Sequence, residues 1–144
     1  MGKLERIWIK RGSGAPMDEV SSAQLVAGRG IVGNANQGGK RQVTLLASDA
    51  WNDATAELMG PDPSVRRANL LVSAIDFRDS RGKTLRIGGV RIRIDGETRP
   101  CYQMDEAVPG LRRALSAPWG GGAFGEVLDD GAISIGDHAE WESA

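Results

Sequence analysis

Cys101 is the one cysteine of this 144-residue chain, and its segment, Arg99-Pro-Cys-Tyr102, has the residues for nucleophilic chemistry. The segment follows a predicted strand and precedes a predicted helix, and functional residues often lie in such connections. Pro100 removes a backbone donor and stiffens the approach. The neighbouring arginine favours the thiolate, which is the nucleophilic form of cysteine. The alternative is that Cys101 packs as a small buried hydrophobe, as free cysteines commonly do.

Basic residues at several places suggest a site for an anion. Lys40 and Arg41 lie between a glycine-rich stretch and a predicted strand, which favours them over the others. The further arginines considered are Arg66, Arg67, Arg91, Arg93 and Arg99. Arginine suits phosphate groups because its guanidinium donates two parallel hydrogen bonds. A cleft of such side chains beside Cys101 would bind a small anionic ligand. The alternative is that they are simply solvated.

A glycine-rich motif and the single histidine indicate less chemistry. Gly28-Arg-Gly-Ile-Val-Gly33 has the spacing of a dinucleotide-binding loop, but that loop needs a helix to open within it. The next residues, 34–39, disfavour a helix, so we expect glycines that serve sharp turns. His138 follows a polar turn and is expected to be exposed. One cysteine and one histidine are too few for a Cys/His zinc site.

The composition excludes several classes of protein. Eighteen basic and nineteen acidic residues give a net charge of −1, without the basic surplus typical of nucleic-acid-binding proteins. No apolar run approaches the roughly 18 residues of a membrane span, and residues 1–10 lack a signal-peptide pattern. A lone cysteine forms no internal disulfide, so a cytoplasmic location is expected. The length, against about 150 residues per domain, predicts one domain over residues 1–144.

Short strands separated by glycine turns dominate the predicted secondary structure. Glycine makes up 20 of the 144 residues, about twice the usual share. In the clearest hairpin, Gly88-Gly89 forms a favoured two-residue turn, and apolar residues alternate with polar ones after it. Residues 11–18 and 61–67 are predicted connections. Strands are predicted at 4–10, 42–47, 69–73, 84–87, 90–95, 123–128 and 132–141.

Two helices complete the prediction. The first begins at Ser48 as N-cap, buries Trp51, Ala54 and Leu58 on one face, and ends at a left-handed Gly60. The second lies within residues 109–117, with its leucines facing inward. Many short strands with only two clear helices predict a mainly β fold of barrel type.

The order of these features resembles the MOSC domain, a small β-barrel module named for the C-terminal part of molybdenum-cofactor sulfurases. No single piece is specific, but their order, with Cys101 after the long hairpin, is fairly specific. The resemblance covers about residues 28–141. Its pieces are residues 30–33, 38–45, 69–71, 85–88, 99–101, 125–128 and 133–137.

The resemblance implies a barrel of the pyruvate-kinase-barrel type with two or three short helices. In the family the cysteine is proposed to carry sulfur as a persulfide or to contact the pterin molybdenum cofactor, and a soft thiolate suits both. Cys101 is then the sulfur carrier or the molybdenum contact. The residues expected to hold the cofactor are Arg99, Lys40, Arg41, Asn34, Asn36, Gln42 and Asn69.

The resemblance also implies partners. Sulfur would come from a separate cysteine desulfurase, whose pyridoxal phosphate this short chain is not expected to bind itself. A molybdoenzyme is the other expected partner. Reduction of N-hydroxylated bases is known among MOSC relatives, but nothing in this sequence singles it out.

Departures from the family pattern leave an alternative open. Where similar single-domain members commonly read Gly-Asp-x-His, this chain reads Gly33-Asn-Ala-Asn36, and Ala68 replaces the glutamate of Glu-Asn-Leu. Asparagine cannot act as a general base, although its amide can hydrogen-bond a pterin or an oxo group. Sulfur carriage or ligand binding is therefore favoured over acid–base catalysis. The alternative is a non-catalytic module, with an inert Cys101, that binds a small anion or a partner oxidoreductase.

Overall fold

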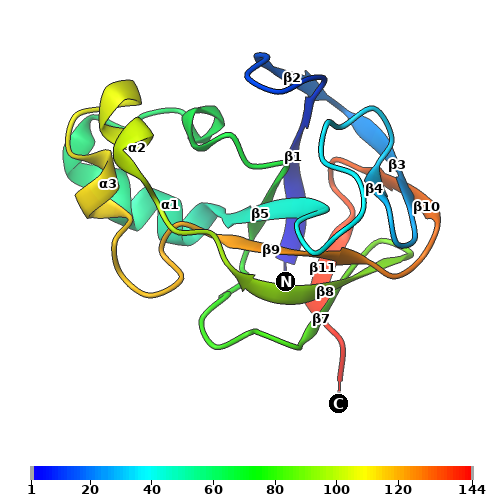
Figure 1. Ribbon diagram of the computed structural model, residues 1–144. Coiled ribbons are helices and arrows are strands. Elements are labelled where there is room, and N and C mark those ends of the chain that lie inside the picture. The colour runs from blue at the N-terminus through cyan, green and yellow to red at the C-terminus, as the bar shows by residue number, and fades with distance from the viewer. Residues whose placement is uncertain (1, 144) are drawn as a thin grey trace.

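Seven strands close into a barrel in the computed structural model, which describes residues 2–143 (Figure 1). The strands follow the hydrogen-bonded order β11-β7-β8-β9-β5-β6-β1, and β1 pairs again with β11. Closure leaves these strands without an unpaired edge. Every neighbouring pair is antiparallel except β5 and β6, which are parallel. The barrel strands are β1 (Gly2–Lys10), β5 (Val43–Ala47), β6 (Leu70–Ser73), β7 (Thr84–Ile87), β8 (Val90–Glu97), β9 (Ala123–Val127) and β11 (His138–Trp141).

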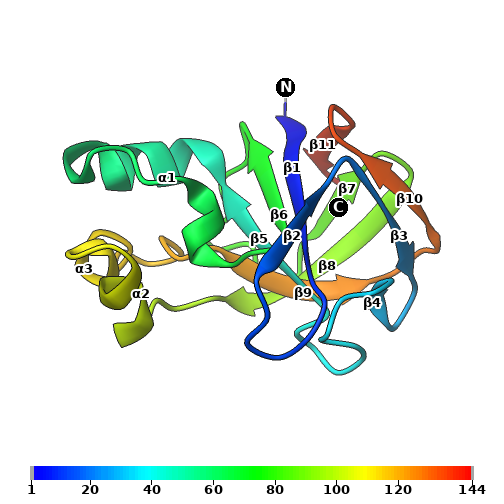
Figure 2. The same ribbon diagram turned by 90° about the horizontal axis from the view of Figure 1, so that it is seen from above.

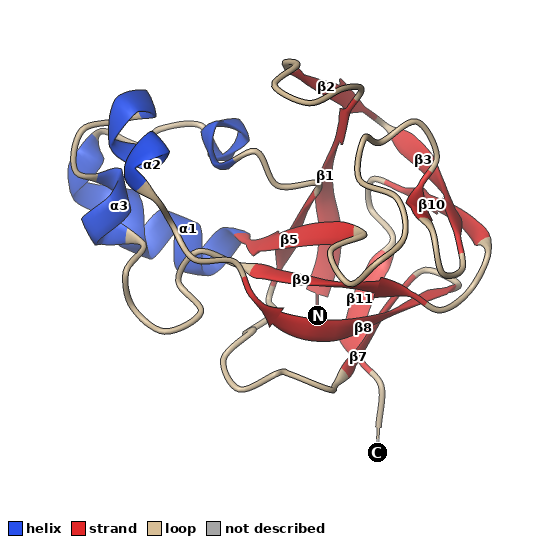
Figure 3. Cartoon of the chain, in the orientation of Figure 1, coloured by secondary structure: helices blue, strands red, loops and turns tan. Residues whose placement is uncertain are grey.

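The remaining elements lie on opposite sides of the barrel. One side carries three short helices within the described chain, α1 (Ser48–Thr55), α2 (Tyr102–Ala107) and α3 (Leu111–Ala114), with the 3₁₀ turns η1 (Ala56–Leu58) and η2 (Pro63–Arg66). The other side carries a small sheet of β10 (Gly131–Ser134), β3 (Ser22–Val26) and β4 (Gly30–Ile31), while β2 (Met17–Val20) extends from β1. Figures 2 and 3 show this separation of helices and strands.

Two apolar clusters hold the fold together. The larger fills the barrel with branched side chains from alternate strand positions, such as Leu4, Ile92 and Ile133. The smaller lies between the outer barrel surface and the helices, where Trp8 of β1 meets Trp51 of α1 and Leu111 of α3. Burial of such side chains contributes roughly 1.5–3 kcal/mol each. The second cluster therefore packs the helices against the outer surface of strands β1, β5 and β6.

The predicted fold class is confirmed: the chain forms a mainly β barrel with three short helices. The hairpin of β7 and β8 turns at Gly88-Gly89 as predicted, with Ile92 opposite Leu85. Val90, Ile92 and Ile94 are buried while Arg93 is exposed, which matches the predicted alternation.

Three local predictions are wrong. Ser48 is not an N-cap, because β5 runs directly into α1, so Ala47 takes the cap position and no side chain caps the helix. The predicted strand over 132–141 is two strands, β10 and β11, because Asp137 Oδ2 accepts a hydrogen bond from Ser134 N (2.8 Å) and turns the chain. Ile135, which the alternation of one continuous strand would place on the same buried face as Ile133, is 45% exposed in that turn.

The helical region after Cys101 also differs from the prediction. Residues 109–117 contain only the short α3, although Leu111 and Leu115 are buried as expected. The sequence did not indicate α2, which precedes it. The predicted loop over 11–18 ends early, since β2 begins at Met17.

Arg6 ties β1 to two other segments through carboxylates. Its Nη2 lies 2.8 Å from Glu19 Oε1 in β2, and its Nη1 lies 2.8 Å from Asp62 Oδ1, just before η2. The hydrogen bond from Arg6 lowers the pKa of Asp62 from its ordinary 3.8 to about 2. A carboxylate with a lowered pKa stabilises the fold above its unfolded pKa, and this contribution is lost as the pH falls through the folded value.

Asp62→Asn is therefore expected to lower the free energy of unfolding at neutral pH. The difference from the wild type should shrink as the pH falls from about 4 toward about 2. Urea unfolding at a series of pH values measures it. Asp53→Asn is the matched control, because Asp53 is exposed on α1 and forms no hydrogen bond or ion pair through its side chain within residues 2–143. A difference that stays constant down to the lowest pH would contradict the role given to this ion pair.

Candidate functional site

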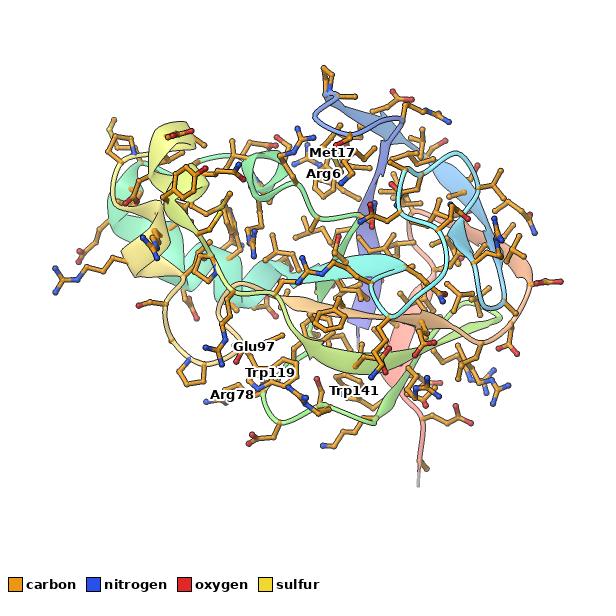
Figure 4. The ribbon with its side chains drawn as sticks, in the orientation of Figure 1. Arg6, Met17, Arg78, Glu97, Trp119 and Trp141 are labelled. Carbon is orange, nitrogen blue, oxygen red and sulfur yellow. The ribbon has the colours of Figure 1, made fainter. Side chains whose placement is uncertain are left out.

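A cavity of about 270 Å³ lies between one end of the barrel and α2, and Cys101 is on its wall. Its walls come from segments that are far apart in the sequence, and Met17 marks the β2 side in Figure 4. The lining residues are Lys10, Met17, Asn34, Asn36, Arg41, Thr44, Arg66, Arg67, Ala68, Asn69, Thr98, Arg99, Cys101, Gln103, Met104 and Gly121.

Hydrogen bonds fix the linker that carries Cys101 from β8 to α2. Thr98 N donates to Gly122 O (3.0 Å), and Thr98 Oγ1 donates to Gly121 O (2.7 Å). Only glycine allows this approach, because a Cβ at Gly121 would lie 2.1 Å from Thr98 O. Just before the linker, Glu97 accepts a hydrogen bond from Trp119 N (2.8 Å), and the two residues lie together in Figure 4. The backbone that leads to the thiol is thus anchored on residues 119–122.

Cys101 itself is exposed at the start of α2. Its backbone is extended, and its carbonyl accepts a hydrogen bond from Met104 N (2.9 Å). The Sγ atom lies 3.7 Å from Gln103 Oε1, a weak polar contact. The structure therefore does not place Cys101 in the core as a buried hydrophobe, and a reagent in the cavity can reach the thiol.

Arg66 is the most enclosed cation of the cavity. Its Nε donates to Gly121 O (3.0 Å) and its Nη2 donates to Thr98 O (3.0 Å), so it joins the two segments that hold the linker. Its Nη1 lies 3.8 Å from the sulfur of Met104, a weak acceptor. Burial lowers the pKa of Arg66, the nearby Cys101 raises it, and the like charge of Arg41 lowers it further. Arg66 therefore lies within electrostatic range of both Arg41 and Cys101.

The cavity is lined by cations without acidic residues. Lys10, Arg41, Arg66 and Arg67 take part in none of the ion pairs formed within residues 2–143. Arg41 stacks over the Phe124 ring at 5.0 Å. The fifth lining cation, Arg99, is 83% exposed and lies 3.5 Å from Glu97, a residue that does not line the cavity. Uncompensated cations gathered in a cavity favour binding of an anion.

Two other cavities differ in charge. One of about 370 Å³ is lined by Glu97 together with two arginines, and one of about 650 Å³ is lined by Asp49, Asp53 and Asp76 together with Arg78, so both contain carboxylates. Neither contains a cysteine. Of these three cavities, the Cys101 cavity is the one that combines an accessible thiol with a lining of cations and no carboxylates.

Comparisons with known proteins agree with this architecture. The family model described as MOSC domain matches residues 32–140, which is most of the chain. The chain belongs to the MOSC domain family. No curated protein sequence matches it.

Solved structures show the same MOSC fold. The YuaD protein of Bacillus subtilis aligns with a TM-score of 0.81 and 21% identity, covering 100% of this chain and 97% of that one. YiiM from Geobacillus stearothermophilus aligns with a TM-score of 0.75 and 12% identity, covering 99% of this chain and 76% of that one. YiiM from Escherichia coli aligns with a TM-score of 0.72 and 15% identity, covering 99% and 70%. At these identities the likeness concerns the fold.

This MOSC domain brings together six of the eight residues singled out from the sequence. Lining the cavity are Cys101, Arg99, Arg41, Asn34, Asn36 and Asn69. Lys40 is exposed and does not line it. Gln42 is buried elsewhere, where its Nε2 donates to Gly39 O (2.9 Å) and its Oε1 accepts from Val127 N (3.0 Å). Gln42 thus holds the glycine-rich loop to β9.

Asn69 faces the cavity, but its amide is already engaged. Its Oδ1 accepts from Thr44 N (3.0 Å) and Thr44 Oγ1 (3.1 Å), and its Nδ2 donates to Trp8 O and Asn34 Oδ1 (both 3.1 Å). All the donor hydrogens of the amide are used, so Asn69 supports the cavity wall. It also orients the neighbouring Asn34.

Sequence reasoning did not assign Lys10, Arg66 and Arg67 to the site. Arg66 and Arg67 stood out as a basic pair, but nothing local indicated that η2 places them beside Cys101. Lys10 ends β1 and lines the cavity together with segments that are distant in the sequence, within residues 34–41, 66–69 and 98–104. His138 is exposed at the start of β11, as predicted.

Two kinds of feature are absent from the described chain. Within residues 2–143, no helix is long and apolar enough to cross a membrane. In the same part of the chain, no group of three or more histidine, cysteine or acidic side chains is arranged to hold a metal ion.

Proposed function

We propose that this MOSC protein acts in sulfur and molybdenum-cofactor metabolism, with Cys101 as a carrier of sulfur in the form of a persulfide. The observation that supports this most is the coincidence of an accessible thiol with five cations and no carboxylates in one cavity. The thiolate is the form of cysteine that accepts sulfur, and nearby cations stabilise the negative charge of the resulting persulfide. No carboxylate or histidine of the described chain lines this cavity, so proton transfer by such a base is not proposed.

The residues of the cavity suit the molybdenum cofactor as the anionic ligand. Its pterin carries a phosphate, and Arg41, Arg66 and Arg67 have no acidic partner that would compete for them within residues 2–143. Cys101 offers a soft thiolate of the kind that suits a soft metal centre. When bound, the cofactor would supply a metal centre that exchanges sulfur or oxygen ligands. The chain's own part is to hold the phosphate and to present the thiol.

In this function the protein would work in the cytoplasm with two kinds of partner, a donor of sulfur and a recipient of sulfur or cofactor. A cysteine desulfurase, which carries its own pyridoxal phosphate, would deliver sulfur to Cys101, and a molybdoenzyme would receive sulfur or cofactor. The mouth of the cavity is formed by exposed residues, including Arg99 and Cys101. A protein partner can therefore reach the thiol without opening the barrel.

Arg41→Met tests the ligand half of this proposal. The variant keeps an apolar stem over Phe124 but removes the charge, and Arg41 makes no side-chain hydrogen bond within the described residues that folding would lose. Loss of one charge-assisted contact, worth about 1.5–3 kcal/mol, should lower the bound cofactor at limiting supply about tenfold or more. Pterin fluorescence and molybdenum content, measured on protein purified from cells that make the cofactor, report the bound fraction.

Arg29→Met is the control, because Arg29 lies in the exposed turn between β3 and β4 and does not line the cavity. It should retain the wild-type content of pterin and molybdenum. Wild-type protein that carries neither, or equal losses in the two variants, would count against the cofactor as ligand of this cavity.

A further inference from the structure

Asn34 places one hydrogen-bond donor in the wall of the Cys101 cavity with no protein partner. Its side chain is buried, at 5% exposure, and its Oδ1 accepts from Lys10 N (2.9 Å) and Asn69 Nδ2 (3.1 Å). Two donors meet that atom, so it must be the amide oxygen, and the other atom must be the Nδ2 donor. The bonds of Asn69 to Thr44 fix the orientation of its own amide and leave no alternative flip.

The Nδ2 atom is accessible and has no partner among residues 2–143. It donates to no atom of residues 2–143, and Asp95 Oδ2 is the only fully enclosed side-chain oxygen or nitrogen of that range without a partner. Asn34 Nδ2 is therefore reachable from outside, and its residue lines the cavity. An accessible donor of this kind bonds to water in the free protein and can exchange that water for an acceptor of a ligand that enters the cavity.

Cations line the same cavity as Asn34. Lys10 and Arg41 have no ion pair in the described chain, and Arg66 uses only part of its guanidinium on backbone carbonyls. These groups donate and do not accept, which matches a tetrahedral oxyanion with several acceptor oxygens. The cavity, at about 270 Å³, lies just below the roughly 300–1,000 Å³ of sites for drug-sized ligands, so a small anion fits within it.

We propose that the cavity also binds thiosulfate-class anions and that Cys101 takes their sulfane sulfur directly. This second source of sulfur requires no partner protein. It rests on the proposed function, in that Cys101 is the acceptor of sulfur. The sulfonate oxygens bind to Asn34 Nδ2 and the cations, and the terminal sulfur faces the thiol.

The transfer balances without an oxidant or reductant. The Cys101 thiol gives its proton to water, and the thiolate so formed attacks the terminal sulfur of thiosulfate. A bond forms between Sγ and that sulfur, and the sulfur–sulfur bond of thiosulfate breaks. Its electron pair leaves on sulfite, and Cys101 becomes a persulfide anion. The total charge of −3 is the same on both sides, and the cavity cations stabilise both anionic products.

The test follows sulfite release and intact protein mass after reduced protein is mixed with thiosulfate, with inorganic polysulfide as a second sulfur donor in parallel. We expect one sulfite per chain and a mass gain of one sulfur atom. Sulfate should slow the reaction with thiosulfate by competing for the oxyanion site, while chloride at equal ionic strength should slow it less. Removing charges by Lys10→Met with Arg41→Met should lower the thiosulfate rate about tenfold or more, whereas Arg29→Met should keep it.

The outcomes separate this inference from the proposed function. If polysulfide loads Cys101 but thiosulfate does not, direct transfer is overturned and the sulfur-carrier function stands. If neither donor loads Cys101 in the folded protein, both fall. Loading by thiosulfate that sulfate does not inhibit, or that the charge-removing variant leaves unchanged, would overturn the oxyanion site.

Discussion

Cys101→Ser should abolish persulfide formation and leave the fold unchanged. Wild-type protein exposed to inorganic polysulfide should gain the mass of one sulfur atom, and the variant should gain none, because serine offers no soft, polarisable acceptor. The chain has one cysteine, so a mass change identifies the residue directly. Cys101 is exposed, and its Sγ forms no hydrogen bond within residues 2–143 beyond the weak 3.7 Å one to Gln103, so the change in stability should stay within about 0.5 kcal/mol.

Two controls make this result informative. Wild-type protein blocked with iodoacetamide should behave like the serine variant, which excludes sulfur adsorbed elsewhere. Thermal unfolding of both proteins should coincide, which excludes loss of the site through unfolding. Wild-type protein that stays unmodified while folded, or takes up sulfur only in denaturant, would contradict the role of Cys101 as carrier.

Gly122→Ala should give the largest loss of stability among the variants described. Gly122 has φ +104°, and a Cβ there would lie 2.3 Å from Leu45 O, inside the β5 backbone. Backbone strain and overpacking together should cost about 2–6 kcal/mol. At about 2–4 °C per kcal/mol for a chain of this size, the melting temperature should fall by roughly 10 °C.

Gly136→Ala separates the two causes of that loss. Gly136 also has a positive φ, +94°, but nothing lies within 4 Å of a Cβ there. It should show only the backbone penalty of about 1–2 kcal/mol. Calorimetry or urea unfolding of the two variants gives the comparison. Equal losses would mean that the close approach of residues 121–122 to β5 and the Cys101 linker does not constrain the fold.

The cations that line the Cys101 cavity, without a carboxylate among them, are expected to lower the free energy of unfolding rather than raise it. Arg66 is partly desolvated, its guanidinium faces backbone carbonyls and a thioether, and no carboxylate among the described residues compensates it. Burying an unpaired charge is unfavourable unless hydrogen bonds or a ligand offset it. Features that break local rules of this kind tend to lie at functional sites. An anion that binds beside Cys101 would supply the missing charge.

Local sequence patterns predicted the strands of the barrel well where the pattern alone determines which face of a strand is buried. Strict alternation after Gly88-Gly89 can bury only one face, so the hairpin of β7 and β8 was predictable. Ser48 was a reasonable cap residue, but the direct passage of β5 into α1 depends on tertiary packing. The split of residues 132–141 depends on Asp137 bonding back to Ser134, which alternation cannot reveal.

The site was predictable only in part, for a related reason. Cys101 and Arg41 stood out through residue type and place in the sequence, and the fold brings both to one cavity. Asn34 and Asn69 meet across 35 positions, and that bond assigns Asn69 to the wall and leaves Asn34 Nδ2 available. No local pattern encodes such a pairing. Lys10 and Arg66 became site residues through the same long-range assembly.

Alkylation of Cys101 by a neutral and an anionic reagent tests most directly whether the thiol faces a cationic cavity. The rates with iodoacetamide and iodoacetate are compared for the folded protein and for the chain unfolded in urea, at the same pH and ionic strength. We expect both reagents to reach the folded thiol, and the iodoacetate-to-iodoacetamide ratio to be several-fold higher in the folded protein than in the unfolded chain. Protection from both reagents, or a ratio that folding leaves unchanged, would contradict the sulfur-carrier site.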